Sequence, residues 1–213
     1  SNGKTNAPSG SYIALSVGND HSCALDTSGS IVCWGLDQEG SVSSAPTSGT
    51  YTDIAAGRFH SCAIEDTGNV VCWGVSDSSG GMGQVDDTPV GGSYTDVSTG
   101  MFNTCVVDSD TSLDCWGDDR KDQLTDMPTD DGYVKVDVGN DHVCALKSDG
   151  SIACWGINSS NASTNSGAVD NMPTTGTFID VSAGYHNSCA IQTDGTAICW
   201  GDDHDGESSP PSD

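Results

Sequence analysis

The amino-acid sequence predicts an all-β fold assembled from five copies of one structural unit. A 24-residue block recurs five times without a gap, and such fixed repetition indicates a repeat architecture. Every block holds two cysteines separated by nine residues, with a Trp directly after the second. Short runs alternate apolar and polar residues, and no helical period is sustained. The repeat cores are residues 12–35, 51–74, 94–117, 133–156 and 178–201.

Each block begins with a predicted strand that ends at a glycine. The stretches "YTDIAAG" and "FIDVSAG" show the alternation of a half-buried strand. Two residues, here called tip residues, then connect this glycine to a His or Asn that begins the second strand. The tip pairs are Asn19-Asp20, Arg58-Phe59, Met101-Phe102, Asn140-Asp141 and Tyr185-His186.

The second half of each block is predicted to be a β-hairpin closed by its own disulfide. Gly29 is the third residue of a three-residue turn, where a type I turn with a bulge needs a left-handed residue. If Asp26 lies opposite Ser30, Cys23 lies opposite Cys33, close enough for a disulfide. The same count holds in every block, although the third turn, 109–111, lacks the glycine. The expected pairs are Cys23 with Cys33, Cys62 with Cys72, Cys105 with Cys115, Cys144 with Cys154, and Cys189 with Cys199.

The ten cysteines favour an oxidising compartment. None is left over after local pairing, which indicates disulfides and a secreted or cell-surface protein. Reduced core thiols and zinc are the alternatives, but nine intervening residues match no common zinc-knuckle spacing. Each eleven-residue ring should stabilise its hairpin by about 2–3 kcal/mol. That contribution matters because only 34% of the residues are hydrophobic.

The chain is strongly acidic, with 31 acids against 6 bases and a formal net charge of −25. Such a surface repels phosphate backbones and argues against a nucleic-acid partner. No apolar run approaches the length of a membrane span. The Asp-rich segments 117–131 and 201–207 are candidates for calcium, but neither has the spacing of an EF-hand loop. We expect no cofactor, with calcium as the open alternative.

One loop per repeat varies in length. It follows the "WG" of each block and precedes a fixed apolar residue and proline; the two longest copies are 75–84 and 157–168. In an up-and-down sheet the tips and these loops share one rim, and the turns and proline linkers share the other. Variable loops on one rim are typical of a binding surface.

The pattern "G-x-x-H-x-x-A-L-x-x-x-G-x-I-x-x-W-G" stands at Gly18–Gly35, Gly57–Gly74 and Gly139–Gly156, with Asn replacing His in the other two blocks. It resembles the signature of the regulator of chromosome condensation repeat family, including its bacterial secreted members. The resemblance implies a β-propeller of four-stranded blades. We therefore expect residues 1–213 to form one five-bladed propeller. Because "NAPSGSY" and "ESSPPSD" both resemble the proline linker, we expect the ends to meet; an open arc is the alternative.

No enzyme motif is found, and a non-catalytic protein is expected. One repeat position holds either His or Asn. A ring of metal ligands is one interpretation, and hydrogen bonds to the local backbone, which Asn also makes, are the other. The exchange of His for Asn favours the second, so no metal site is expected. The residues at this position are His21, His60, Asn103, His142 and Asn187.

Large side chains at the tips indicate a binding rim. Ten of the thirteen Phe, Tyr and Trp residues belong to the repeat framework, and the remaining three, Phe59, Phe102 and Tyr185, are tip residues. Arg58, the only base at a tip, is a candidate anchor for an acidic or hydroxyl-rich group. The alternative is that the aromatic rings plug the central channel. The predicted rim consists of Arg58, Phe59, Met101, Phe102, Tyr185 and His186.

These observations favour an extracellular, non-catalytic module that binds a protein or a surface glycan through one rim. The alternative is a structural subunit that assembles with itself, through its loops, into an extracellular filament or coat.

Overall fold

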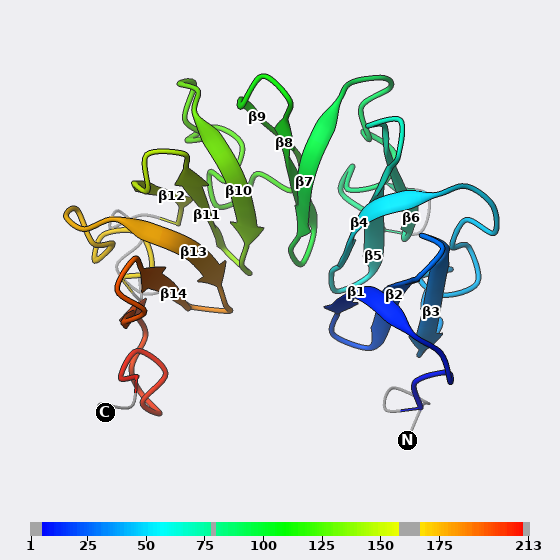
Figure 1. Ribbon diagram of the computed structural model, residues 1–213, viewed down its shortest axis with the longest axis horizontal. Helices are drawn as coiled ribbons and strands as arrows, with labels where there is room; N and C mark the ends of the chain where they lie inside the picture. Colours follow the sequence, from blue (N-terminus) through cyan, green and yellow to red (C-terminus); the bar gives the residue numbers. More distant parts are fainter. Residues whose placement is uncertain (1–5, 78–79, 158–166, 211–213) are drawn as a thin grey trace.

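The computed structural model describes residues 6–77, 80–157 and 167–210 (Figure 1). As predicted, each repeat forms one antiparallel sheet, here called a blade, with its three strands in chain order. The blades are β1 (Tyr12–Val17), β2 (His21–Asp26) and β3 (Ile31–Gly35); β4 (Tyr51–Ala56), β5 (His60–Glu65) and β6 (Val70–Gly74); β7 (Tyr94–Thr99), β8 (Asn103–Asp108) and β9 (Leu113–Gly117); β10 (Tyr133–Val138), β11 (His142–Lys147) and β12 (Ile152–Gly156); β13 (Phe178–Ala183), β14 (Asn187–Gln192) and β15 (Ala197–Gly201).

The predicted hairpin register is confirmed. Cys23 lies opposite Cys33, and Leu25 lies opposite Ile31. In the third blade, where the turn lacks glycine, Thr111 takes the left-handed conformation with φ 68°. The turn geometry is therefore kept there at the cost of a strained β-branched residue.

The predicted disulfides are also confirmed. All ten cysteines are paired within their own blades, and none is free. Every disulfide joins the middle of a second strand to the middle of the third strand beside it, so each hairpin is cross-linked within its own blade. The bonded pairs are Cys23 with Cys33, Cys62 with Cys72, Cys105 with Cys115, Cys144 with Cys154, and Cys189 with Cys199.

The fourth strand that the family resemblance implies is absent from the described residues. After the third strands of the first and third blades the chain forms turns, and an aspartate closes them. One carboxylate oxygen of Asp37 accepts the backbone N–H groups of Val42 and Ser43, and Asp119 does the same for Leu124 and Thr125. The expectation of four-stranded blades is wrong because these N–H groups bind a carboxylate instead of a neighbouring strand.

The hydrophobic core lies between successive blades. Cys23 and Leu25 of the first blade pack against Tyr51, Ile54 and Trp73 of the second, and all five are at most 5% exposed. Equivalent residues form the other three interfaces. One face of each blade therefore receives the next blade, and its opposite face inserts against the previous one.

The Trp after the second cysteine also ties neighbouring blades together. The Trp73 indole N–H donates to the carbonyl of Ser41, in the turns that follow the first blade, at 3.1 Å. The same bond recurs in the next three blades. The other pairs are Trp116 with Gln84, Trp155 with Gln123 and Trp200 with Ala168.

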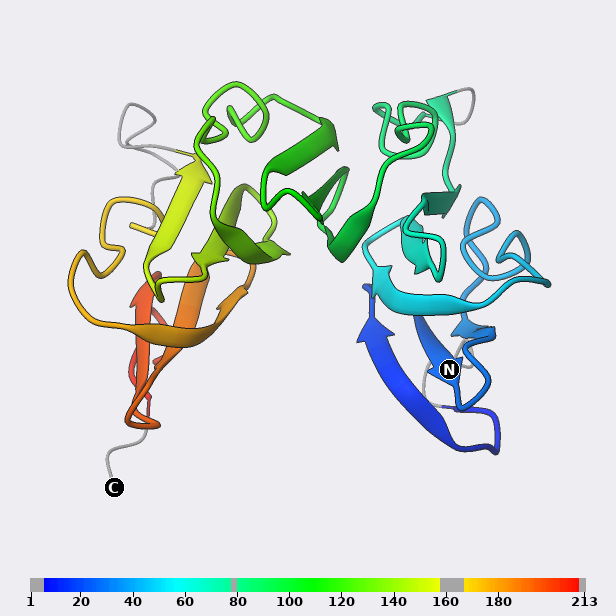
Figure 2. The same cartoon turned by 45° about the horizontal axis from the view of Figure 1, so that its top comes forward.

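The five blades form an open arc rather than a closed ring. In Figures 1 and 2 the first and last blades lie at opposite ends of the arc, with a gap between them and the chain ends on either side of it. The expected meeting of the ends is wrong, and the open alternative describes the molecule. Each blade adds one rotation about a common axis, and five such rotations do not complete a turn. Within the described part of the chain, no helix has the length and apolar character needed to cross a membrane.

Candidate functional site

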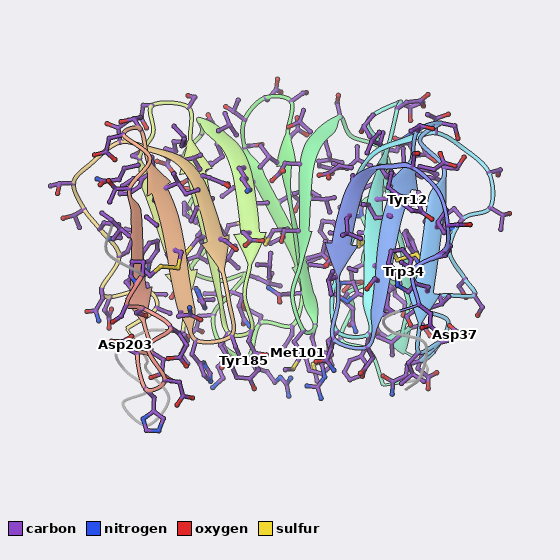
Figure 3. All side chains as sticks on the ribbon, turned by 60° about the horizontal axis from the view of Figure 1, so that its bottom comes forward. Tyr12, Trp34, Asp37, Met101, Tyr185 and Asp203 are labelled. Atoms are coloured by element: carbon purple, nitrogen blue, oxygen red, sulfur yellow. A yellow bond between two sulfur atoms is a disulfide. The ribbon has the colours of Figure 1, made fainter. Side chains whose placement is uncertain are left out.

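The first strand of every blade lines an axial channel, and the tips surround its mouth. The mouth is a cleft of about 430 Å³ bordered by the end of each inner strand, the following glycine and the first tip residue. The first tip residues are Asn19, Arg58, Met101, Asn140 and Tyr185. Met101 and Tyr185 lie on one rim in Figure 3, the rim on which Asp37 and Asp203 of the loops also lie.

The second tip residues Phe59 and Phe102 lie away from this mouth. Together with Asp37, Glu39 and Val75 they line a separate cleft of about 530 Å³. The two phenyl rings therefore do not plug the channel. Tyr185 does border it, with 60% of its surface exposed.

Four side chains from the second and third repeats form a chain of ring and cation contacts, here called the rim cluster: Arg58, Phe59, Phe102 and Arg120. The guanidinium carbon of Arg58 lies 4.7 Å from the centre of the Phe59 ring. The Phe59 and Phe102 ring centres are 5.6 Å apart. The guanidinium carbon of Arg120 lies 5.6 Å from the centre of the Phe102 ring. Each ring therefore has a cation against it, an arrangement that is favourable because the ring face is electron-rich.

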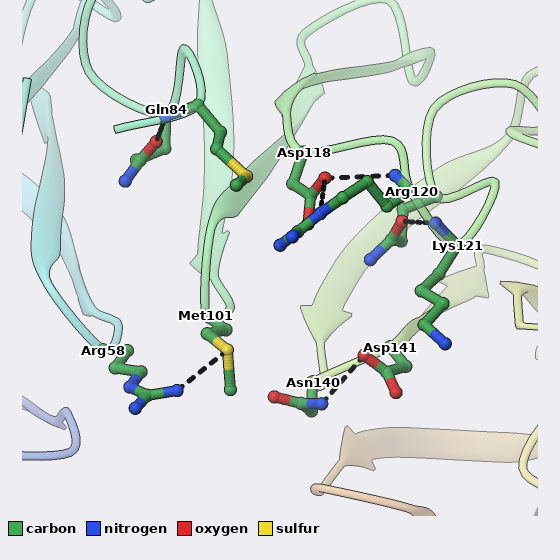
Figure 4. A network of polar contacts seen from close by, with 10 residues as sticks. Arg58, Gln84, Met101, Asp118, Arg120, Lys121, Asn140 and Asp141 are labelled. Atoms are coloured by element: carbon green, nitrogen blue, oxygen red, sulfur yellow. Dashed lines mark hydrogen bonds and ion pairs between the residues drawn. The ribbon is translucent and has the colours of Figure 1, made fainter. Parts of the chain in front are cut away.

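The two arginines of the rim cluster differ in charge compensation. Arg120 donates from Nε and Nη2 to the carboxylate of Asp118, which raises the pKa of Arg120 further above its usual range. Within the part of the chain that the structure describes, the Met101 sulfur, 3.0 Å from Nη1, is the one side-chain acceptor of Arg58, and the buried Nε of Arg58 has no partner (Figure 4). Arg58 therefore carries the uncompensated positive charge at the mouth.

Arg120 and Lys121 are rim residues that the sequence pattern did not predict. Both border a third cleft of about 220 Å³ beside Met101 and Phe102. They lie within the segment 117–131, whose many aspartates suggested calcium instead of a basic site. The signal that could have identified them is that two of only six bases, in a chain of net charge −25, are adjacent. Together with Arg58, half of the bases of this chain lie on the rim.

The variable loops lie beside the tips, as predicted. The Val75 N–H donates to the Phe59 carbonyl, and the Asp118 N–H donates to that of Phe102. The residue after each remaining "WG" makes the same bond to a tip carbonyl. Of the two loops expected to flank the site, 75–84 contributes Val75 and Gly80 to the cleft around Phe59. Residues 158–166 of loop 157–168 lie outside the described residues.

The six predicted rim residues fall into two groups. Arg58, Phe59, Met101 and Phe102 are linked by direct contacts across the second and third blades. Tyr185 packs edge-on against His186 at a ring distance of 4.3 Å. Tyr185 meets the first group only across the open channel mouth, which it shares with Arg58 and Met101.

Below the mouth the channel is lined by carboxylates. Asp53, Asp96 and Asp137 border a polar space of about 520 Å³. Each accepts a backbone N–H from the inner strand of the next blade. Burial raises the pKa of Asp96 to about 6, and the nearby Asp53 and Asp137 charges act in the same direction. Lys135 pairs with Asp180 and supplies the one cation of this space among the described residues.

The His/Asn position links successive blades. Nε2 of His21, His60 and His142 lies 2.7–2.8 Å from the hydroxyl oxygen of Ser61, Thr104 and Ser188, each on the next blade. Burial lowers the pKa of His60 to about 3 and of His142 to about 4, so both imidazoles are neutral. The expected bonds to the local backbone are wrong, because the partner is a side chain of the following blade.

The Asp-rich segments use their carboxylates internally. Both carboxylate oxygens of Asp119 accept hydrogen bonds from loop residues Leu124 and Thr125, and Asp203 accepts from Ser208 and Ser209. Among the described residues, no three His, Cys, Asp or Glu side chains are placed to hold a metal ion together.

The sequence matches the family model described as "Regulator of chromosome condensation (RCC1) repeat" over residues 12–41, 51–84, 133–162 and 178–207. These four segments cover more than half of the chain. The third block, whose turn lacks glycine, lies outside them but folds like the others. No curated protein sequence matches the chain significantly.

Solved structures share this arrangement of blades. The ectodomain of the Physcomitrella patens receptor kinase CR4 superposes with a TM-score of 0.78 at 22% identity, over 97% of this chain and 55% of that one. The ectodomain of the Arabidopsis thaliana receptor kinase ACR4 superposes with a TM-score of 0.68 at 22% identity, over 94% of this chain and 66% of that one. Prp20p from Saccharomyces cerevisiae superposes with a TM-score of 0.68 at 20% identity, over 89% of this chain and 57% of that one. The chain therefore spans about half to two thirds of each of these structures, and at such identities the likeness concerns the fold.

Proposed function

This chain belongs to the regulator of chromosome condensation repeat family, and from that premise we propose that it is an extracellular, non-catalytic binding module. Its ligand is a protein or a surface glycan, and the ligand contacts the rim that carries the tips. The observation that carries the proposal is the rim cluster together with Met101, because these large side chains lie outside the four interblade cores.

The extracellular location is supported by the disulfides. Five of them in a 213-residue chain are typical of an oxidising compartment. Two proteins with the same arrangement of blades, CR4 and ACR4, are named as receptor kinase ectodomains.

The composition of the rim supports recognition of a macromolecule. Phe, Met and Arg are enriched in protein interfaces, and Arg is one of the residues most often found to dominate their binding energy. Phe59 and Phe102 are half-buried and border a cleft, so a ligand group that enters it desolvates both rings.

The ligand group at the mouth is anionic or rich in hydroxyls. Arg58 has no carboxylate partner among the described residues, and its planar guanidinium suits a carboxylate, a sulfate or a pair of hydroxyls. Nucleic acid is not the ligand, because the net charge of −25 repels a phosphate backbone at long range, and the attraction of Arg58 alone does not offset this repulsion.

An array of neutral, carboxylated and sulfated oligosaccharides, combined with an array of extracellular protein domains, tests the function. The wild-type chain is expected to bind at least one member. A variant with Phe59→Ala, Phe102→Ala and Tyr185→Ala is expected to lose that binding and keep its melting temperature within a few degrees.

The matched control replaces three exposed apolar residues away from the rim: Val90→Ala, Val134→Ala and Ile179→Ala. These side chains are at least 46% exposed, and none borders the mouth. The control is expected to bind like the wild type. If the rim variant binds as well as the control, or if the wild type binds neither array, the proposed function is wrong.

A further inference from the structure

The rim holds a small cleft between the tips of the third and fourth blades, here called the tip cleft. It has a volume of about 220 Å³ and is bordered by both tip pairs and by the turns after β9. Met101 and Asn140 also border the mouth, so the tip cleft and the mouth adjoin. The polar side chains of the tip cleft that Figure 4 labels are Asp118, Arg120, Lys121, Asn140 and Asp141.

The charges of the tip cleft cancel. Asp118 and Asp141 are matched by Arg120 and Lys121, two acids against two bases, in a chain that has 31 acids against 6 bases. A cationic ligand would meet the two bases, and an anionic polymer would be repelled at long range by the net charge of −25. The tip cleft is therefore strongly polar without favouring either sign of charge.

The turns after β9 hold the two bases in place. Asp118, which is 8% exposed, accepts hydrogen bonds from the backbone N–H and the guanidinium of Arg120. The Lys121 N–H donates to Oε1 of Gln123, which is 2% exposed, at 2.9 Å. The second blade repeats this bond with the Met82 N–H as donor. The backbone here is thus part of the repeat framework, whereas the side chain at the position of Lys121 differs between blades.

Two charged groups of the tip cleft are left for a ligand. The Lys121 ammonium forms no ion pair with a described residue. Oδ1 of Asp141 accepts a hydrogen bond from Nδ2 of Asn140 at 2.8 Å, and Oδ2 accepts none from a described residue. An ammonium only donates hydrogen bonds and a carboxylate only accepts them, whereas a hydroxyl does both. A ligand with several hydroxyls therefore satisfies both groups without carrying a charge itself.

Two apolar side chains complete the lining. Met101 and Phe102 are half-buried and border the same space. A sugar ring carries hydroxyls around its edge and C–H groups on its faces, so it offers both kinds of surface at once. A few placed polar groups beside an apolar wall are the usual composition of a small-molecule site. The volume of the tip cleft equals that of about seven water molecules, at about 30 Å³ each, and accommodates one such ring.

We propose that the tip cleft binds one residue of an uncharged glycan, while the adjoining residue of the same glycan enters the mouth beside Arg58. Asp141 accepts a hydrogen bond from one hydroxyl, and Lys121 donates to another. The planar Arg58 guanidinium donates to a pair of hydroxyls. This inference rests on the proposed function and selects one of its two ligand classes, the surface glycan, with neutral sugar residues at the contact.

Isothermal titration calorimetry with neutral probes tests the ligand class. The probes are cellohexaose, xylohexaose, mannohexaose, maltohexaose and chitohexaose, and hexagalacturonate and free amino acids are the charged comparisons. The wild-type chain is expected to bind at least one neutral probe, and more tightly than either comparison. Because this ligand is uncharged, its affinity should change less than about twofold between about 50 and about 500 mM salt.

Two variants test the contacts. Asp141→Asn keeps an acceptor for Asn140 but removes the charge, and it should weaken binding at least about tenfold, the loss expected for one hydrogen bond to a charged group. Lys121→Met introduces the side chain that the second blade carries at this position, so the fold should be kept while binding weakens by a similar factor. The melting temperature of each variant checks the fold.

The matched controls change the same charges elsewhere. Asp20→Asn alters the other Asn-Asp tip, where Nδ2 of Asn19 donates to the Asp20 carboxylate, and Asp20 does not border the tip cleft. Lys147→Met removes a base at the end of β11, on the opposite rim. Both controls are expected to bind like the wild type.

Folded variants that bind as well as their controls, or a neutral-sugar affinity that falls steeply with salt, would overturn the proposal. So would a wild-type chain that binds only a charged probe, or only an extracellular protein domain through the rim. In that last case the proposed function stands and the neutral glycan is wrong. A wild-type chain that binds no sugar and no protein domain overturns both.

Discussion

Nε2 of His60 lies 2.8 Å from Oγ1 of Thr104, which belongs to the next blade. This contact explains why one repeat position holds His in three blades and Asn in two. His occurs wherever the following blade supplies a hydroxyl, at Ser61, Thr104 or Ser188. Asn103 is followed by a blade with Val143 at that position, and Asn187 lies on the last blade.

Replacing Asn103 by His and Val143 by Ser should create a fourth copy of this contact. Asn103→His alone buries an imidazole nitrogen without a partner and lowers the free energy of unfolding by about 1–3 kcal/mol. With Val143→Ser added, the loss is partly recovered, and a double-mutant cycle in urea should give a coupling of about 1 kcal/mol. Thr104→Ser, which keeps the hydroxyl beside His60, is the control and should be milder than Thr104→Ala. Additive effects in the cycle would show that the contact contributes nothing.

The cross-strand disulfides should contribute stability one blade at a time. Cys62→Ala with Cys72→Ala opens a ring whose ends are ten residues apart, and it lowers the free energy of unfolding by about 2–3 kcal/mol. Urea unfolding without reductant measures the loss. Peptide mapping of the variant should still find the four other within-blade pairs. Scrambled pairs would show that the hairpins do not set the pairing independently.

The buried carboxyl of Asp96 should make the chain less stable at neutral pH than an amide would. Its pKa is about 6 when folded, above the ordinary 3.8, because burial opposes its charge. Between these values the folded chain binds more protons than the unfolded chain, so the contribution of Asp96 to stability falls as the pH rises. Asp96→Asn, which can still accept the Val136 N–H, should raise the free energy of unfolding by about 1–3 kcal/mol above pH 6. The gain should disappear below pH 4.

The test compares urea unfolding of this variant with that of Asp26→Asn over the same pH range. Asp26 is only partly buried at the end of β2, and hydrogen bonds from Ser28 and Ser30 lower its pKa. Its stabilising contribution is present at neutral pH and is lost in acid, so Asp26→Asn should show the opposite pH dependence. An Asp96→Asn effect that does not change with pH would mean that the carboxyl is solvated in the folded chain.

The open arc itself predicts a difference between two equivalent turn glycines. Both have positive φ, 79° at Gly29 and 90° at Gly195. A Cβ at Gly29 would lie 2.7 Å from a methyl carbon of Thr50 on the way into the second blade, whereas one at Gly195 would meet nothing within 4 Å. Gly195→Ala should cost about 1–2 kcal/mol from backbone strain alone. Gly29→Ala should cost measurably more by thermal unfolding, and equal costs would indicate that the last turn is covered too.

The sequence by itself determined the features that depend on neighbouring residues. The 24-residue repeat, the turn residues and the opposition of Cys23 to Cys33 all follow from counting along one hairpin, because a two-stranded register is set by its own turn. The rim shared by tips and variable loops follows in the same way from strand direction.

Only the tertiary structure decided the contacts between residues of different blades. Whether the ring closes depends on the rotation at each interface, and that angle is set by the joint packing of residues such as Leu25, Ile54 and Trp73. The partner of His60 lies on the next blade, 44 residues away. The placement of Arg120 over Phe102 and the position of Phe59 in a cleft away from the channel also depend on how the turns after a blade pack on its tip. No local sequence pattern specifies such contacts, because the neighbours of these side chains are brought together only when the blades pack against each other.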